Sequence, residues 1–199
     1  MSVSLQKGQK VELRKENGST LTRVMVGLGW DEAPKSGGLF SGMFSGSSSQ
    51  IDCDASAFVC SGGRLTSNKD IVYYANLTHP SQCVRHMGDN LTGAGDGDDE
   101  QIMVDLQQLP AEYDKIVFVV NIFQAAQRRQ NFGMIRNAFI RICDESGKEL
   151  CRYNLSENYD GMTAMIFGEL YRHNGAWKFN AIGQATTDNS IQDLAKKFV

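Results

Sequence analysis

Apolar residues alternate with polar ones along most of this chain, which is the period of a β-strand with one buried face. Val3 and Leu5, and then Val11 and Leu13, follow this period. Apolar runs rich in β-branched and aromatic residues follow at 24–30, 51–60, 70–77, 115–123, 138–143, 150–155, 163–173 and 176–183. Asn174-Gly175 predicts a type I′ hairpin between the last two runs, and 145–148 (ESGK) predicts another hairpin turn. Eight or more short strands predict an all-β fold, an antiparallel sandwich of two sheets with little helix.

Helical periodicity is clearest at the C-terminal end of the chain. Ile191, Leu194, Ala195 and Phe198 fall at i, i+3, i+4 and i+7, and Ser190 is a residue type that caps helix starts. We expect a short helix at about 189–199 that packs its apolar face on the sandwich. With no internal repeat and no dividing linker, residues 1–199 are expected to form a single domain.

The segment 35–49, KSGGLFSGMFSGSSS, breaks the strand pattern. Ten of its fifteen residues are Gly or Ser, yet it carries four large apolar residues, Leu39, Phe40, Met43 and Phe44. A flexible linker does not need such side chains, and one helical turn would place all four on one face. Two hypotheses stay open: an insertion folded back onto the sandwich, or a docking tip for a partner.

The densest charge lies at 88–101, GDNLTGAGDGDDEQ. Its five carboxylates are Asp89, Asp96, Asp98, Asp99 and Glu100, and it contains neither Lys nor Arg. The span 89–100 has the length of an EF-hand loop, but Leu91, Gly93 and Ala94 stand where that motif needs side-chain oxygens or its turn glycine. The sequence therefore predicts either a solvated loop or a different kind of cation site.

A second acidic group favours the cation site. In a strand, Asp52 and Asp54 point to one face, and Asp31 ends the run at 24–30. Carboxylates side by side on one face destabilise a strand unless they have a partner. We expect loop 89–100 to fold over the strand end that carries Asp52 and Asp54 and to hold a divalent cation.

Net charge, the lack of targeting segments and the cysteine spacing limit the partners, the cell location and the kinds of site expected. A net charge of −3 draws the chain to neither nucleic acid nor an anionic membrane, and the Arg128-Arg129 pair is a short basic patch typical of a solvated loop. With no signal peptide and no apolar run long enough to span a membrane, a cytoplasmic location is expected. The five cysteines lack CxxC spacing and are interpreted as small buried hydrophobes.

Catalysis is not expected from this sequence. His79, His86 and His173 lie in no catalytic motif, and His173 is interpreted as an exposed hairpin residue. The alternative is a divalent-metal-dependent hydrolase of phosphoesters that uses the acidic cluster to hold Mg²⁺.

Five stretches resemble the TerD family of bacterial tellurium-resistance and stress proteins. They are GLGWD (27–31), DCDASAF (52–58), GDNLTGAGDGDDEQI (88–102), NAFIRI (137–142) and GELYRHNGAWKFNAIGQ (168–184), within a resemblance that runs from about residue 2 to 184. The resemblance implies a β-sandwich that binds two Ca²⁺ ions. It also implies that the protein acts with other tellurium-resistance or stress proteins, in solution or at the inner face of the membrane. The implied ligands are Asp31, Asp52, Asp54, Asp89, Asn90, Asp96, Asp98, Asp99 and Glu100, with backbone oxygens from 92–97. Their division between the two ions, and the oligomeric state, stay open.

The sequence departs from the family pattern at several points. Ala94 stands where family members often have an acidic residue, which bears on the affinity of one ion site. Cys53 stands where Leu is usual, and the insertion with LFSGMF resembles that of the TerZ- or TerX-like branch. The tail after Gln184 lacks the usual Gly-rich ending, so nothing is carried over to it.

Overall fold

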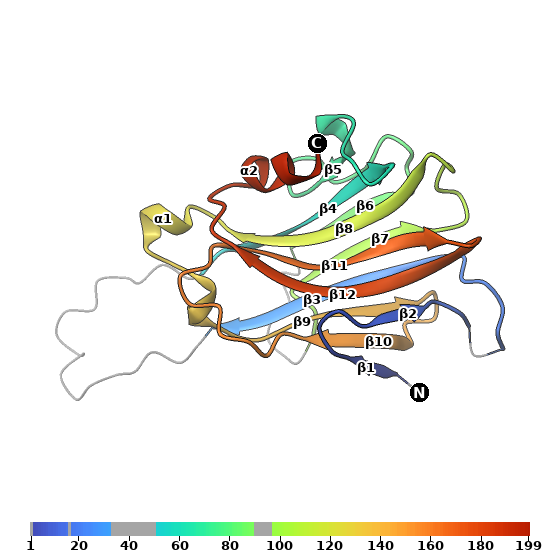
Figure 1. Ribbon diagram of the computed structural model, residues 1–199, viewed down its shortest axis with the longest axis horizontal. Coiled ribbons are helices and arrows are strands. Elements are labelled where there is room, and N and C mark those ends of the chain that lie inside the picture. Colours follow the sequence, from blue (N-terminus) through green and yellow to red (C-terminus); the bar gives the residue numbers. More distant parts are fainter. Residues whose placement is uncertain (1, 16, 33–50, 90–96) are drawn as a thin grey trace.

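The computed structural model describes residues 2–15, 17–32, 51–89 and 97–199, with the backbone only of Asp89. Twelve strands in the described residues form two six-stranded sheets that lie face to face (Figure 1). The first sheet has the order β1 (Val3–Leu5), β10 (Glu149–Asn154), β9 (Ile135–Asp144), β3 (Arg23–Glu32), β7 (Glu100–Asp105) and β6 (Val84–Asp89). The second has the order β2 (Lys10–Glu12), β12 (Ala176–Thr186), β11 (Ala164–His173), β8 (Tyr113–Ile122), β4 (Cys53–Ser61) and β5 (Ile71–Val72). The predicted all-β sandwich is confirmed.

Strand pairing is antiparallel with one exception. β1 runs parallel to β10, and the chain then crosses to the second sheet, where β2 pairs antiparallel with β12. Both predicted hairpins are confirmed. Asn174 and Gly175 have positive φ angles of 51° and 76° between β11 and β12, and Gly147 turns the chain between β9 and β10.

Alternation along the strands places the core between the sheets. Val24, Val26 and Leu28 of β3 face Phe118 and Val120 of β8 across one apolar cluster. All five cysteines are buried and free, as expected. β8 is buried on both faces over its second half, which explains its unbroken apolar run.

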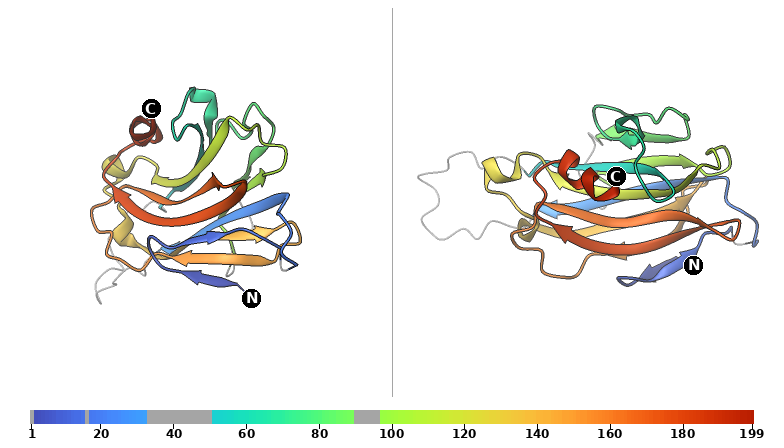
Figure 2. Two further views of the ribbon diagram at one scale, coloured as in Figure 1. Left: turned by 45° about the vertical axis from the view of Figure 1, so that its right-hand side comes forward. Right: turned by 45° about the horizontal axis from the view of Figure 1, so that its top comes forward.

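The outer face of the second sheet has its own cover (Figure 2). Helix α2 (Ile191–Ala195), capped by Ser190 and continued by η3 (Lys196–Phe198), packs on this face. Ile191, Leu194 and Ala195 are buried there, so the predicted C-terminal helix and its apolar face are confirmed. A second helix, α1 (Ala125–Arg128), follows β8 and was not predicted.

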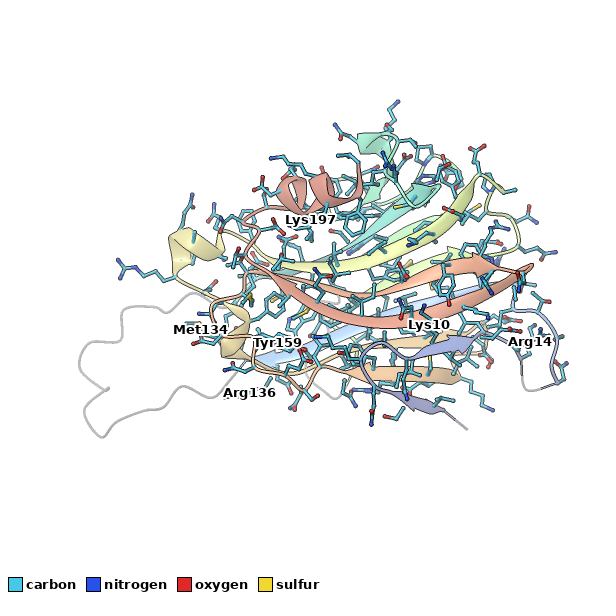
Figure 3. The ribbon with its side chains drawn as sticks, in the orientation of Figure 1. Lys10, Arg14, Met134, Arg136, Tyr159 and Lys197 are labelled. Atoms are coloured by element: carbon cyan, nitrogen blue, oxygen red, sulfur yellow. The ribbon has the colours of Figure 1, made fainter. Side chains whose placement is uncertain are left out.

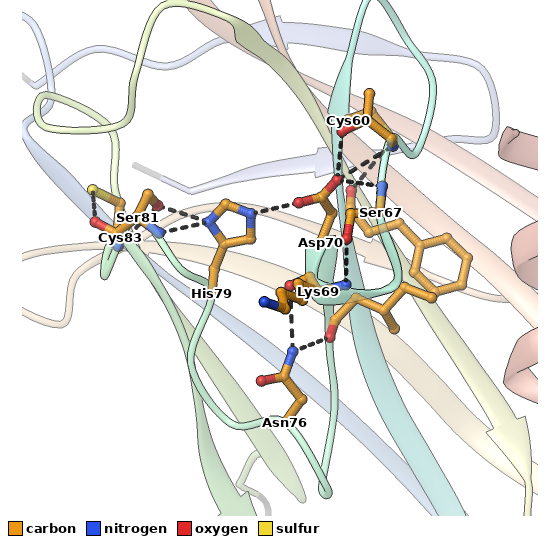
Figure 4. A network of polar contacts seen from close by, with 11 residues as sticks. Cys60, Ser67, Lys69, Asp70, Asn76, His79, Ser81 and Cys83 are labelled. Atoms are coloured by element: carbon orange, nitrogen blue, oxygen red, sulfur yellow. Dashed lines mark hydrogen bonds and ion pairs between the residues drawn. The ribbon is translucent and has the colours of Figure 1, made fainter.

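The predicted strand at 70–77 is shorter than expected. Only Ile71 and Val72 join the sheet, after η1 (Asn68–Asp70). Asn76 ends the strand because its side-chain amide donates to the Ile71 carbonyl at 2.7 Å, while its backbone pairs with Tyr73 in a tight turn. A buried polar network holds this region against the next turn (Figure 4).

That network joins Asp70 and His79. Asp70 accepts hydrogen bonds from Thr66 and Ser67 as part of a capping box, and His79 Nε2 lies 3.3 Å from the other Asp70 oxygen. The Ser81 backbone N–H donates to His79 Nδ1 at 3.2 Å, which assigns the ring proton to Nε2. His79 therefore donates to Asp70 as a neutral imidazole.

The segment 33–50, with Leu39, Phe40, Met43 and Phe44, lies outside the described residues, but its two flanks are described. The Ile51 backbone N–H donates to Glu32 Oε1 at 2.8 Å. The chain therefore leaves β3 and returns toward β4 at neighbouring points. Of the residues described, none belongs to a helix long and apolar enough to cross a membrane.

Candidate metal centre

The acidic segment connects β6 and β7, two strands that the sequence did not predict. These strands pair antiparallel at one edge of the first sheet, with Asp89 opposite Glu100. The end of the segment is fixed to β3, because the Asp99 backbone N–H donates to the Leu28 carbonyl at 2.9 Å. Residues 98–100 consequently point in different directions, and each meets a different part of the sandwich.

Asp98 lies on the outer face of the first sheet and is bound by an arginine. Arg141 of β9 donates to both carboxylate oxygens, from Nε at 2.7 Å and from Nη2 at 3.0 Å. Gln101 donates to the same carboxylate at 3.0 Å, and the Asp98 side chain is fully buried. Donation to Asp98 raises the pKa of Arg141. Gly27 makes room for this pair, because a Cβ at Gly27 would overlap the Asp98 carboxyl group.

Glu100 points the other way, into the space between the sheets. Its Oε2 accepts the Ala55 backbone N–H of β4 at 2.6 Å and lies 3.2 Å from His86 Nε2. The Gly88 N–H donates to His86 Nδ1, so the His86 proton is on Nε2 and faces the carboxylate. Glu100 therefore links the acidic segment to the strand that carries Asp52 and Asp54.

Asp31 and Asp99 form a corner at the end of β3. Asp99 accepts the Trp30 backbone N–H at 2.6 Å, and Asn137 donates to Asp31 at 2.8 Å. Burial raises the pKa of Asp99, the bond from Trp30 lowers it, and the charges of Asp31 and Asp98 raise it further. Within the described residues, no hydrogen bond reaches the second carboxylate oxygen of either Asp31 or Asp99.

The acidic pair at the start of β4, with Asp52 just before the strand and Asp54 within it, has the predicted orientation. Cys53 and Ala55 face the core, while Asp52 is exposed and lies 3.7 Å from Arg128, and Asp54 points to the outer face. Burial raises the pKa of the Cys53 thiol, and the charges of Asp54, Glu100, Asp52 and Asp99 raise it further. Carboxylates from the acidic segment and from β4 thus act on one buried residue between them.

The remaining predicted ligands lie outside what the structure describes. Asn90 and Asp96 belong to the segment 90–96, and of Asp89 only the backbone is described. Among the described residues, no three His, Cys, Asp or Glu side chains form a group that could hold a metal ion. A complete ion site would need side-chain or backbone oxygens from the segment 89–96.

The described carboxylates differ in how well they could act as ligands of a hard cation such as Ca²⁺. Asp31 and Asp99 are carboxylates with an oxygen to offer, which is the ligand type that Ca²⁺ prefers. Asp98 and Glu100 instead carry hydrogen bonds from protein donors. The corner at Asp31 and Asp99 is therefore the described part of the site that fits an ion best.

The sequence did not predict that Arg141, Gly27 or His86 would contact the acidic segment. Arg141 stands inside the apolar run 138–143, and a charge within a buried strand is a signal for a buried partner. His86 alternates with Val84 in a strand that is short and polar enough to be read as loop.

The chain is similar in sequence and in fold to known proteins. A model of the TerD domain matches residues 1–198. The chain is 47% identical over 200 residues to stress response protein SCP2 of Bacillus subtilis, covering all of both chains. It is 48% identical over 186 residues to tellurium resistance protein TerD of Serratia marcescens, covering 92% of this chain and 91% of that protein. A crystal structure of a TerD homologue from Streptomyces coelicolor shares the fold with a TM-score of 0.63 at 20% identity, covering 90% of this chain and 98% of the other.

Proposed function

This chain belongs to the TerD family of tellurium-resistance and stress-response proteins, and from that membership we propose that it is a Ca²⁺-binding module that acts through partner proteins. In this proposal it protects a bacterial cell, from the cytoplasmic side, against tellurite and other chemical stress. Two Ca²⁺ ions are held by the acidic segment together with Asp31 and the acids of β4. We propose no catalytic role.

The corner formed by Asp31 and Asp99 is the observation that carries the proposal. These carboxylates come from β3 and from the end of the acidic segment. Burial raises the pKa of Asp99, and the charge of Asp31 raises it further. Arg136 is opposite Asp31 in the strand register and Arg141 is bound to Asp98, but within the described residues neither arginine forms an ion pair with Asp31 or Asp99. A divalent ion at the corner supplies the positive charge that these two carboxylates lack and gains hard oxygen ligands.

The negative charge of the segment 88–101 also supports the proposal that the protein acts through partner proteins. Neutralising the segment 88–101 fixes its geometry, so that a contact surface forms only in the ion-bound state. We propose that four residues of the insertion at 35–49 take part in that contact: Leu39, Phe40, Met43 and Phe44. The partners are other tellurium-resistance or stress proteins, in solution or at the inner face of the membrane.

Calorimetry on chelator-stripped protein tests the ion site. We expect Ca²⁺ to bind in the presence of excess Mg²⁺, and the double change Asp31→Asn with Asp99→Asn to weaken Ca²⁺ binding at least tenfold. Glu145→Gln is the matched control, because this exposed acid lies at the opposite end of β9 from Asp31 and, among the described residues, pairs with Lys15. Its Ca²⁺ affinity should equal that of the unchanged protein.

Two results would overturn the proposal. If Glu145→Gln lowers Ca²⁺ affinity as much as the double change does, the ion binds through general surface charge and not at this corner. If Mg²⁺ binds more tightly than Ca²⁺ and the protein turns over a phosphoester such as p-nitrophenyl phosphate, the hydrolase hypothesis replaces the binding module.

A further inference from the structure

A cavity of about 250 Å³ lies on the outer face of the second sheet, between the turn that carries α1 and the start of α2. Figure 1 shows both short helices at the same end of the sandwich. Asp54 and Ser56 of β4 and Asn121 of β8 line it from the sheet. Asp54 is opposite Asn121 in the strand register, so the three side chains lie on one face. Further along, the same face is apolar, with Phe58 and Val119 under α2.

Ser56 has a buried hydroxyl that nothing described in the protein satisfies. The residue is 1% exposed, and among the described residues its Oγ has no hydrogen-bond partner. Leaving a buried hydroxyl unpaired costs about 1–3 kcal/mol. The cavity offers a remedy, because its volume is several times the roughly 30 Å³ that one water occupies. A ligand group in the cavity would satisfy Ser56.

The other lining residues indicate what that ligand is. Five of the described ones carry carboxamides: Asn121, Gln124, Gln127, Asn189 and Gln192. A carboxamide, like a hydroxyl, both donates and accepts hydrogen bonds, so its best partner also does both. Tyr73, Tyr74 and Phe123 add aromatic surface, with the two tyrosine rings edge to face at 5.2 Å. Asp54 alone is charged among the described lining residues, which disfavours phosphates and carboxylates.

We propose that this cavity binds a small, neutral, polyhydroxylated molecule of the size of one sugar ring. Neighbouring hydroxyl groups match the carboxamides and Ser56 in donating and accepting, and the C–H face of the ring packs against the aromatic side chains. The volume is below the roughly 300–1,000 Å³ of sites for drug-sized ligands, which favours one ring over an oligosaccharide. Ser56 and Asn121 lie outside the acidic set, and Asp54 is the one described lining residue that this site shares with the proposed Ca²⁺ ligands.

Ligand-observed NMR followed by calorimetry tests the proposal with four probes: D-glucose, D-mannose, D-ribose and myo-inositol. We expect saturable binding of at least one of them at millimolar concentration, in chelator as well as in Ca²⁺. Ser56→Ala should weaken that binding about tenfold without lowering the melting temperature, since it removes an unsatisfied buried group. Ser61→Ala, on the same strand but outside the cavity lining, is the matched control and should bind as the unchanged protein does.

Asn121→Leu provides a second variant that keeps the side-chain volume and removes the amide. The proposal is overturned if none of the four probes binds, or if binding survives both Ser56→Ala and Asn121→Leu. It is also overturned if putrescine binds more tightly than every neutral probe, because the cavity would then select a cation through Asp54. A melting temperature that falls in Ser56→Ala while probe binding stays unchanged would make Ser56 a structural group only.

Discussion

Asp98 shows how burial changes the role of a single carboxylate. Its side chain is fully buried and accepts hydrogen bonds from two described residues, Arg141 and Gln101. A buried ion pair is costly to break, because removing one partner leaves the other charge without compensation. Asp98 therefore fastens the acidic segment to the outer face of the first sheet, whatever ion binds beside it.

We expect Asp98→Asn or Arg141→Met to lower the free energy of unfolding by about 3 kcal/mol. Urea unfolding in excess chelator measures this effect without any contribution from a bound ion. The control is Glu157→Gln, which breaks the exposed pair with Lys7 and should cost less than about 1 kcal/mol.

Combining the two changes checks the assignment. Once Asp98 is neutral, Arg141→Met removes the longer, part-exposed pair with Glu149 at 3.6 Å but no pair with Asp98, so the double variant should cost clearly less than the sum of the single variants. Additive losses would show that Asp98 and Arg141 stabilise the protein independently, against this account.

For single residues, the sequence predicted the direction of the side chain well and its contact partner poorly. Alternation placed Asp52 and Asp54 on one face and Cys53 on the other, because strand geometry alone decides this. The contacts of Asp98 and Glu100 did not follow from local pattern, since Arg141 and Ala55 are more than forty residues away from them in the chain. The need for glycine at position 27 is evident only from the structure, because the Asp98 carboxyl group occupies the place of a Cβ.

At the scale of elements, the turn at 79–83 depends on a buried neutral histidine. His79 is fully buried, accepts from Ser81 and donates to Asp70 (Figure 4). The Tyr113 ring lies edge to face with the His79 ring, at 4.8 Å between the ring centroids. Burial lowers the pKa of His79, and the bond and charge of Asp70 offset only part of that effect. The folded state therefore binds the His79 proton less readily than the unfolded chain does.

The sign of the pH dependence follows. Above the unfolded pKa of about 6.5, His79 is neutral in both states and its contribution is fully present. As pH falls below that value, the unfolded chain takes up a proton first, so the free energy of unfolding decreases until the folded pKa is passed.

Urea unfolding at a series of pH values from 7.5 to 5 should show this decrease, and His79→Gln should flatten it because glutamine does not titrate while its amide still donates toward Asp70. His173→Gln, at an exposed hairpin, should leave the slope unchanged. Equal slopes in the His79→Gln variant and the unchanged protein would assign the pH dependence to other groups.

Elements with regular alternation were predicted, and those that depend on the acidic segment were not. The residues of β7, EQIMVD, alternate between buried and half-buried positions, but the inward position of Glu100 is a carboxylate, which hides the strand pattern. Helix α1 has four residues and no side-chain cap, so neither periodicity nor capping marks it in the sequence. The C-terminal helix carries both signals and was predicted correctly.

For the whole molecule, ion binding and folding are linked. If the proposed ions bind the native state only, they stabilise it by RT ln(1 + [L]/Kd), about 2.7 kcal/mol at a hundredfold excess over Kd. We expect the melting temperature to rise between excess chelator and millimolar Ca²⁺, with a smaller rise in equimolar Mg²⁺. A melting temperature that is the same in excess chelator and in millimolar Ca²⁺ would count against the metal centre.

Figure 3 shows Arg136, Met134 and Tyr159 at the end of the sandwich where β9 begins, which is also the end where Asn137 meets Asp31. Side chains from the first sheet, from η2 (Phe132–Met134) and from the turn before β11 gather there. The proposed ion site therefore belongs to one end of the molecule, where distant parts of the chain meet. This convergence could not be derived from sequence spacing.

The bond between Glu32 and the Ile51 backbone brings together the two residues that flank the segment 33–50. Closing a chain segment costs an entropy that grows only with the logarithm of its length, about 0.6 kcal/mol for each doubling. With the ends already adjacent, segments of very different length can be accommodated at this point at nearly the same free energy of folding. Evolution is accordingly free to lengthen, shorten or rewrite residues 33–50 while the twelve strands stay in register, and the same position would accept a foreign peptide.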